Sequence, residues 1–153
     1  MIKVMFVCLG NICRSPMAEF VFKDMVKKQG LEKEFFIKSS ATSSEEIGND
    51  IHFGTKDKLI QKGIPFEKRK ATKLKAEDYK KYDYIIGMEE SNIKNIRNIV
   101  CEDKENKIYR LLDFSNNPRD IADPWYTGNF EATYNDIAEG CKNFLLYLNT
   151  KKQ

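Results

Sequence analysis

Residues 2–16 read IKVMFVCLGNICRSP, an apolar run followed by a short loop and a helix-start signal. The run at residues 2–7 is typical of a buried strand, and Ser15-Pro16 is a common beginning of a helix. Gly10 and Asn11 tolerate the left-handed backbone that a tightly curled loop needs. The stretch therefore predicts a strand, a sharply curved loop and a helix in direct succession.

A thiol and a guanidinium, Cys8 and Arg14, bracket this loop. With its N–H groups pointing inward the loop forms a nest for an anion, and the helix start adds the positive end of its dipole. The Arg14 guanidinium offers a planar fork of donors that suits two oxygens of a phosphate. Positive surroundings lower the pKa of a thiol, so Cys8 is expected to be a thiolate near neutral pH. The plainer alternative is a strand–turn–helix connection whose cysteine is merely buried.

Length and composition describe a single globular domain over residues 1–153. The chain is 41% hydrophobic and 32% charged, which is typical of a soluble protein with a real core. A formal net charge of +3 is too mild to indicate nucleic-acid binding. The N-terminal apolar run is too short for a secretory signal, and no stretch is long enough to span a membrane. We therefore expect neither a nucleic-acid nor a membrane partner.

Cysteine and histidine usage argues against a metal site. The four cysteines show no metal-ligand spacing, and the single histidine, His52, offers no zinc partner set. Cys141 lies on the apolar stripe of an expected helix, so core packing is its expected role. His52 is expected on a helix surface. The cysteine usage favours a reducing cytoplasm. The sequence leaves open whether the protein is a monomer or a weak dimer.

The rest of the chain alternates between strand and helix patterns. Strands are expected at residues 2–7, 35–37, 82–87 and 108–112, and polar loops at 39–49 and 113–129. Helices are expected at 16–29, from a cap at Asp50 to Gly63, near 76–81, around 93–100 and from 130 to 148. This alternation predicts an α/β fold, a four-stranded parallel sheet with helices on both faces, of the flavodoxin or Rossmann type. Ligands of such sheets bind at the carboxyl ends of strands, and Cys8 lies just past one.

A second chemical element lies in the long loop before the last helix, at Asp123-Pro124-Trp125-Tyr126. Cleavage of a phosphate ester by a thiolate needs a proton for the leaving oxygen, and a carboxyl group on a loop can supply it. Pro124 stiffens the loop and restricts Asp123 to an extended backbone. Trp125 and Tyr126 would wall an aromatic slot for a flat leaving group. The alternative is an ordinary turn whose aromatic residues cover the edge of the core.

Three segments together resemble one enzyme family. Residues 7–16, VCLGNICRSP, resemble the signature of the low-molecular-weight protein tyrosine phosphatases. Residues 82–92, YDYIIGMEESN, are similar to that family's third strand and the turn after it, and residues 123–126, DPWY, to its general-acid loop. The resemblance covers nearly the whole chain in the right order, and implies the phosphotyrosine phosphatase I-like fold.

The resemblance implies hydrolysis of phosphotyrosine in a protein substrate through a phosphocysteine, without a metal or other cofactor. Cys8 would attack phosphorus while Asp123 protonates the departing oxygen and later activates water. Arg14 would hold the equatorial oxygens of the phosphate. The residues that would bind the phosphate ligand are Leu9, Gly10, Asn11, Ile12, Cys13, Arg14 and Ser15, and those that would line the substrate pocket are Ile12, Trp125 and Tyr126.

The resemblance also implies roles for residues around the nucleophile. Ser15 would donate a hydrogen bond to the Cys8 sulfur and assist its departure as a thiolate. Asn11 would hold the loop in shape, with Ser39 as its partner. Cys13 would form a reversible disulfide with Cys8 that protects the thiolate from overoxidation.

The chain departs from the family pattern in two places. Members usually carry a His followed by an Arg-Gln pair after the Gly-Ile that corresponds to Gly63-Ile64, whereas residues 67–73 here read EKRKATK. Whether Arg69 replaces that His is left open. An aromatic residue is also usual near Glu45 in the loop that faces the active site, whereas residues 44–46 read SEE. Trp125 stands where Tyr is commoner, which keeps the slot aromatic.

Three rival functions are compatible with parts of this pattern. An arsenate reductase on the same fold would need further cysteines at about residues 87–96, and this stretch contains none. A phosphate sensor would not need nucleophile, guanidinium and acid together. Phosphoarginine phosphatases of this family carry a smaller polar residue in place of Ile12, so the branched apolar side chain here favours phosphotyrosine.

Overall fold

The computed structural model describes residues 1–151 and contains a four-stranded, entirely parallel sheet. The strand order is β2-β1-β3-β4, which places β1 and β3 in the centre. The strands are β1 (Ile2–Cys8), β2 (Phe35–Ala41), β3 (Tyr84–Gly87) and β4 (Ile108–Arg110). The predicted α/β fold class is confirmed.

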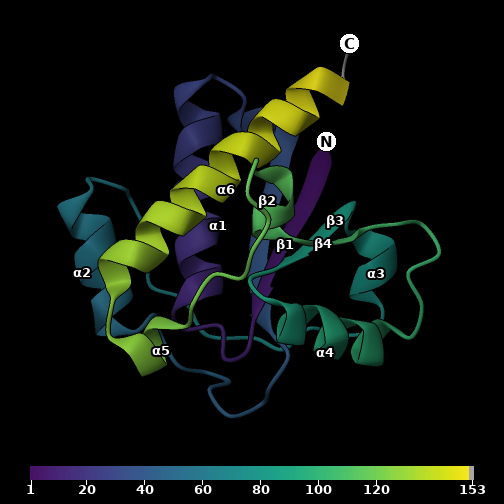
Figure 1. Cartoon of the computed structure of the whole chain (residues 1–153), viewed down its shortest axis with the longest axis horizontal. Helices are drawn as coiled ribbons and strands as arrows, with labels where there is room; N and C mark the ends of the chain where they lie inside the picture. Colours follow the sequence, from purple (N-terminus) through teal and green to yellow (C-terminus); the bar gives the residue numbers. More distant parts are fainter. Residues whose placement is uncertain (152–153) are drawn as a thin grey trace.

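Helices cover both faces of the sheet (Figure 1). One layer contains α1 (Arg14–Lys28), α2 (Phe53–Gln61) and the long α6 (Phe130–Lys151), and the other contains α3 (Asp78–Lys81) and α4 (Glu90–Val100). Shorter turns of helix are η1 (Glu32–Glu34), η2 (Leu111–Phe114) and α5 (Pro124–Thr127). None of the helices described within residues 1–151 is both long and apolar enough to cross a membrane.

The side chains of β1 alternate between two hydrophobic cores. Val4, Phe6 and Cys8 pack in the core beneath α1 and α6. Met5 and Val7 face the second core, beneath α4. This alternation is the ordinary period of a strand, and here it directs the Cys8 side chain toward the beginning of α1. The last residue of the central strand thereby meets the helix start that follows it in sequence.

Strand β2 is longer than the sequence pattern indicates. Residues 39–41 were expected in a polar loop, but they continue the strand, with Ser39 opposite Phe6 and Ala41 opposite Cys8. Ser39 and Ser40 are buried, at 9% and 1% exposure. The prediction failed because buried serines carry no hydrophobic signal, while their pairing with β1 is a long-range contact.

Helix α2 begins later than predicted. Its N-cap is His52, whose Nδ1 accepts a hydrogen bond from the Gly54 N–H at 3.0 Å. The expected cap Asp50 instead forms an ion pair with Lys56 at 2.8 Å and accepts a hydrogen bond from the Arg69 N–H at 3.2 Å. The Lys56 contact is the main reason why the pKa of Asp50 falls to about 2. The expected position of His52 on the helix surface is met only in part, because the residue lies at the N-cap of α2 and is half-buried.

The structure also differs from the sequence pattern at the end of the fourth expected strand and within the loop that follows it. The predicted strand at 108–112 ends at Arg110, because Leu111 and Leu112 turn into η2 and fill the core as part of a 3-10 helix. The expected loop at 113–129 contains the four-residue helix α5. A helix of one turn has no period for a sequence pattern to detect.

Candidate active site

Hydrogen-bond donors surround the Cys8 sulfur at the carboxyl end of β1. The backbone N–H groups of Asn11 and Ser15 donate to Sγ at 3.3 and 3.4 Å. The Ser15 hydroxyl lies 3.1 Å from the same sulfur. Cys8 is 3% exposed, so few waters can provide these bonds instead. An arrangement of several donors around one sulfur suits an anionic thiolate.

The loop between β1 and α1 holds its carbonyl groups outward. The carbonyl oxygens of residues 8, 9, 11, 12 and 13 accept hydrogen bonds from Thr42 N–H, Ser43 N–H, the Arg69 guanidinium, His52 N–H and Met17 N–H respectively. In a planar trans peptide the N–H points away from the C=O of the same unit. The N–H groups that follow these carbonyls therefore turn toward the inside of the loop, where they form the predicted anion nest.

Asn11 fixes the shape of the loop. Its backbone is left-handed, with φ of 58°, and its side chain is buried. The Asn11 amide donates to the Ser15 hydroxyl at 2.7 Å and to the Ser39 hydroxyl at 2.9 Å. Ser39 in turn donates to the buried carboxylate of Glu19 at 2.5 Å. The extension of β2 brings Ser39 within reach of Asn11, whereas no pattern in the sequence points to Glu19.

Arg69 reaches the same loop from the connection after α2. Its guanidinium donates to the backbone carbonyl of Asn11 and, at 3.2 Å, to that of Asn49. Burial lowers the pKa of the Arg69 guanidinium, while Glu19 and Asp50 act in the opposite direction. The guanidinium thus contacts Asn11, the residue of the loop that has a left-handed backbone. Whether Arg69 makes such a contact in place of the family's usual His was the question that the resemblance left open.

Replacing Arg69 with methionine is expected to loosen the loop. The carbonyls of Asn11 and Asn49 would lose a charged donor, and such hydrogen bonds contribute about 1.5–3 kcal/mol. We expect a comparable fall in the free energy of unfolding, measured in urea, and weaker inhibition by vanadate. Arg69→Lys is the control, because it keeps one donor and should show a smaller loss. Unchanged vanadate affinity in Arg69→Met would contradict a role of this residue in shaping the loop.

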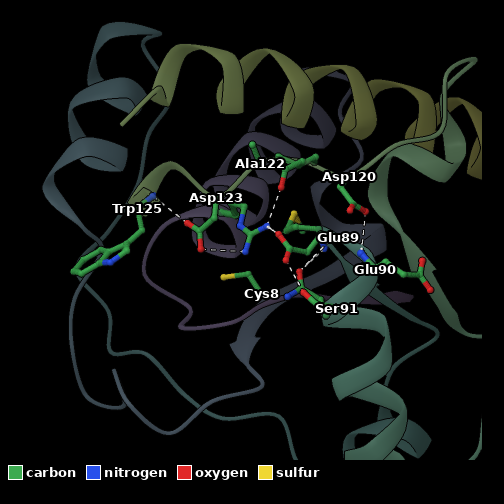
Figure 2. A network of polar contacts seen from close by, with 12 residues as sticks. Cys8, Glu89, Glu90, Ser91, Asp120, Ala122, Asp123 and Trp125 are labelled. Atoms are coloured by element: carbon green, nitrogen blue, oxygen red, sulfur yellow. Dashed lines mark hydrogen bonds and ion pairs between the residues drawn. The ribbon is translucent and has the colours of Figure 1, made fainter. Parts of the chain in front are cut away.

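Arg14 is fully enclosed at the floor of the site, with 2% exposure. Its Nη1 forms an ion pair with the Glu89 carboxylate at 2.5 Å and donates to the Ile121 carbonyl at 2.8 Å. Its Nη2 lies 3.3 Å from the Asp123 carboxylate. Figure 2 shows Glu89, Asp123 and Cys8 gathered in one part of the site, with dashed lines that mark the ion pairs of the two carboxylates. Two fixed partners on Nη1 orient the planar fork so that its remaining donors serve an anion above Cys8.

Sequence reasoning assigned no role to Glu89. It follows β3 at the carboxyl end of a central strand and precedes α4, where its second oxygen accepts a hydrogen bond from Ser91 at 2.5 Å. The sequence does contain one usable signal for Glu89. Its carboxylate follows a strand, and the carboxyl ends of parallel strands meet at the edge of the sheet where Cys8 also lies. The partner could not be named from sequence, because Arg14 lies 75 positions away.

The second chemical element adjoins the first. Asp123 caps α5, because one of its oxygens accepts the Trp125 N–H at 3.0 Å while the other faces Arg14. Trp125 and Tyr126 follow at 56% and 76% exposure. A cavity of about 110 Å³ lies between these parts, lined by Cys8, Leu9, Gly10, Ile12, Cys13, Arg14, Glu45, Glu46, Asp123, Trp125 and Tyr126. The structure thus brings the sequence-predicted nucleophile, guanidinium, acid and pocket residues to one cavity.

Part of the lining of the cavity is acidic. Glu45 and Glu46 line it, and Glu46 accepts a hydrogen bond from the Asn49 amide at 2.6 Å. The Glu46 side chain passes over the loop at Gly10, where an added Cβ would lie 3.3 Å from its Cγ. The acidic residues noted in the sequence therefore line the same cavity as the aromatic residues Trp125 and Tyr126.

Cys13 lies on the same loop but in different surroundings. Burial, and to a smaller extent the neighbouring Cys8 sulfur, raises the pKa of Cys13 to about 12. Cys13 therefore remains a protonated thiol, and it forms no disulfide with Cys8 in this structure. Of the two loop cysteines, only Cys8 has the donors that suit a nucleophile.

Comparison with known proteins identifies the family. Residues 3–153 match the sequence model described as Low molecular weight phosphotyrosine protein phosphatase. The chain belongs to this family. A curated relative of this phosphatase, the low molecular weight protein-tyrosine-phosphatase YfkJ of Bacillus subtilis, is 41% identical over 100% of this chain and 99% of its own. PtpA of Staphylococcus aureus is 38% identical over 97% of this chain and 94% of its own.

Solved structures agree with the family assignment of this phosphatase. The crystal structure of YfkJ superposes with a TM-score of 0.96 and covers 100% of this chain and 98% of that one. The structure of DARP, a Drosophila arginine phosphatase, superposes with a TM-score of 0.88 at 29% identity and covers 96% of this chain and 98% of that one. The fold therefore accommodates more than one leaving group, and the choice must come from the pocket.

Proposed function

We propose that this phosphatase hydrolyses phosphotyrosine in protein substrates through a phosphocysteine intermediate. The convergence of the Cys8 sulfur, the Arg14 guanidinium and the Asp123 carboxylate on one cavity carries the proposal. A module that only binds phosphate needs the anion nest and the guanidinium, but neither a nucleophile nor an acid. The presence of both in one cavity favours catalysis over sensing.

In the first step the Cys8 thiolate attacks phosphorus. An S–P bond forms while the bond between phosphorus and the tyrosine oxygen breaks. Asp123 gives its proton to the departing oxygen, so that tyrosine leaves as a neutral phenol. Arg14 and the inward N–H groups of the loop stabilise the charge on the equatorial oxygens of the transferring phosphoryl group.

In the second step water attacks the phosphocysteine. Asp123, now a carboxylate, takes a proton from this water as the new O–P bond forms. The S–P bond breaks, and the electron pair returns to the Cys8 sulfur. The Ser15 hydroxyl, 3.1 Å from this sulfur, donates a hydrogen bond that stabilises the departing thiolate.

The lining of the cavity supports a flat, apolar leaving group. Ile12 is 9% exposed and contributes a branched hydrocarbon surface beside the nucleophile. Trp125 and Tyr126 add aromatic surface that can pack on a phenyl ring. A guanidinium-type leaving group would place several N–H donors against Ile12, which offers no acceptor, so that only the carboxylates of the lining, such as Glu45 and Glu46, could satisfy them. In this proposal the branched side chain of Ile12 and the aromatic surface of Trp125 and Tyr126 favour phosphotyrosine, and phosphoarginine is the alternative that the acidic residues make worth testing.

A panel of matched phosphopeptides tests the proposal. We expect release of phosphate from a phosphotyrosine peptide with a kcat/KM at least about tenfold above that for the phosphoarginine and phosphoserine peptides, a difference of about 1.4 kcal/mol in transition-state binding. Trapping the reaction with acid should leave phosphate on Cys8. A preference for phosphoarginine would overturn the substrate assignment, and thioredoxin-dependent reduction of arsenate would replace the function altogether.

The free thiol required by this chemistry favours a reducing compartment, and we place the enzyme in the cytoplasm. Cys13 is the closest thiol along the loop to the nucleophile. In this proposal it serves as the resolving partner of an oxidised Cys8, which would return to the thiolate on reduction.

A further inference from the structure

His52, the chain's sole histidine, connects two walls of the active-site cavity. Its backbone N–H donates to the Ile12 carbonyl at 2.9 Å, which ties it to the nucleophile loop. Its Nδ1 accepts the Gly54 N–H at 3.0 Å and so caps α2. These two bonds fix both the position of the residue and the orientation of its ring.

The His52 ring lies within a group of aromatic side chains. It stacks on Phe53 with 4.4 Å between ring centres and on Phe130, at the beginning of α6, with 5.5 Å. The stack on Phe130 depends on the residue at 54, because a Cβ on Gly54 would lie 2.4 Å from the Phe130 ring. Phe130 in turn packs against the small cluster that Ile12 and Cys13 of the nucleophile loop form with Ala71.

The Trp125 indole meets this group edge-on. Its ring centre lies 5.5 Å from that of His52, at an interplanar angle of 73°. Trp125 belongs to the one-turn helix α5 and is 56% exposed, so the surrounding core holds it only in part. Edge-to-face geometry between aromatic rings is favourable and directional. The contact with His52 therefore restrains an otherwise exposed wall of the substrate slot.

We propose that His52 is a positioning residue whose ring holds Trp125 in place as the wall of the slot, and thereby sets the preference of the site for aryl over bare phosphates. The inference rests on the proposed function, since it concerns the substrate end of the same cavity. The backbone bond from His52 to Ile12 is independent of the side chain, whereas the ring contacts neither the reacting atoms nor the phosphate-binding groups and acts through Trp125. Its expected effect is on the binding of the aromatic group and not on that of the phosphate.

Two substitutions separate this role from the capping of α2. His52→Asn keeps an oxygen that can accept the Gly54 N–H, and asparagine is among the best N-caps, but the ring is lost. His52→Phe keeps a ring for Trp125 but has no acceptor for Gly54. If the ring sets the selectivity, His52→Phe should keep the selectivity of the wild type and His52→Asn should lose it. Thermal stability should show the reverse, since His52→Asn keeps the cap of α2 and His52→Phe does not.

Calorimetric titration with phenylphosphonate and with inorganic phosphate measures the selectivity without turnover. In His52→Asn we expect the ratio of the two affinities to fall about 2- to 13-fold, the range that an aromatic pair contributes. Acrylamide should quench Trp125, the sole tryptophan, more strongly in this variant. His52→Phe should match the wild type in both measurements and melt at a lower temperature. Ile60→Asn, on the exposed face of α2, is the control. It should change neither the affinity ratio nor the quenching of Trp125.

A wild-type affinity ratio in His52→Asn would overturn the inference, as would an equal loss in both His52 variants. Failure of the proposed function has a different signature. In that case the wild-type protein would bind both anions but release no phosphate from phosphotyrosine, while the affinity ratio and the quenching of Trp125 would still depend on the ring at position 52.

Discussion

Cys8→Ser is expected to abolish turnover while leaving the fold intact. Serine is close to cysteine in size, and the donors around position 8 remain for its oxygen to accept. A hydroxyl, however, does not ionise near neutral pH and is a far weaker nucleophile than a thiolate. Loss of a catalytic nucleophile typically lowers kcat by at least roughly 10⁴-fold. We expect a loss of this size for every phosphate ester tested.

The measurement combines hydrolysis of p-nitrophenyl phosphate with calorimetric binding of phosphate. Binding should survive the substitution, because the loop N–H groups and Arg14 supply the contacts to the anion. Cys101→Ser is the matched control, since this cysteine is exposed. It should leave the rate unchanged. A rate in Cys8→Ser above about one per cent of the wild-type rate is far more than a loss of roughly 10⁴-fold would leave. Such a rate would mean that another group attacks phosphorus.

The parts of the site that were predictable from sequence are local in the chain. The strand, the loop and the helix start at residues 2–16 follow from an apolar run, two residues that tolerate a left-handed backbone and a Ser-Pro pair. Asn11 does adopt a positive φ, and Cys8 does end a central strand. Each of these features depends on neighbours a few positions away, and a single sequence can supply them.

The residues that hold this loop in shape come from far along the chain. Arg14 lies 75 positions from Glu89, and Arg69 lies 58 positions from Asn11. No periodic pattern marks such pairs, and exposed or buried charges look alike in a sequence. The same reason explains Glu19, a helix residue whose spacing gives no sign that it accepts the Ser39 hydroxyl.

Competition between neighbouring residues explains the error at the start of α2. Asp50 and His52 are two positions apart, and aspartate is the better N-cap by propensity. The ion pair with Lys56 occupies the Asp50 carboxylate, and aromatic packing fixes His52 at the helix start. Tertiary contacts thus overrode a local preference at a position where the chain is bonded to the nucleophile loop.

Asp123→Asn is expected to slow hydrolysis in proportion to how poor the leaving group is. Asparagine keeps an oxygen to accept the Trp125 N–H, so the acid loop should retain its shape. It cannot give a proton to the departing oxygen, and lost acid catalysis typically costs about 10²–10⁴-fold. Phenyl phosphate and phosphotyrosine should therefore lose the most, whereas p-nitrophenyl phosphate, whose phenolate leaves without help, should lose the least.

A series of substituted phenyl phosphates measures this effect as the dependence of kcat/KM on the pKa of the leaving phenol. The dependence should be shallow in the wild type, because proton transfer offsets the developing charge, and steep in Asp123→Asn. Asp120→Asn provides the matched control, since Asp120 lies on the same loop but bonds to Glu90 and Arg110 instead of facing the cavity. Its slope should equal that of the wild type. An unchanged slope in Asp123→Asn would assign the proton to another group, because a general acid that is lost must expose the basicity of the leaving oxygen.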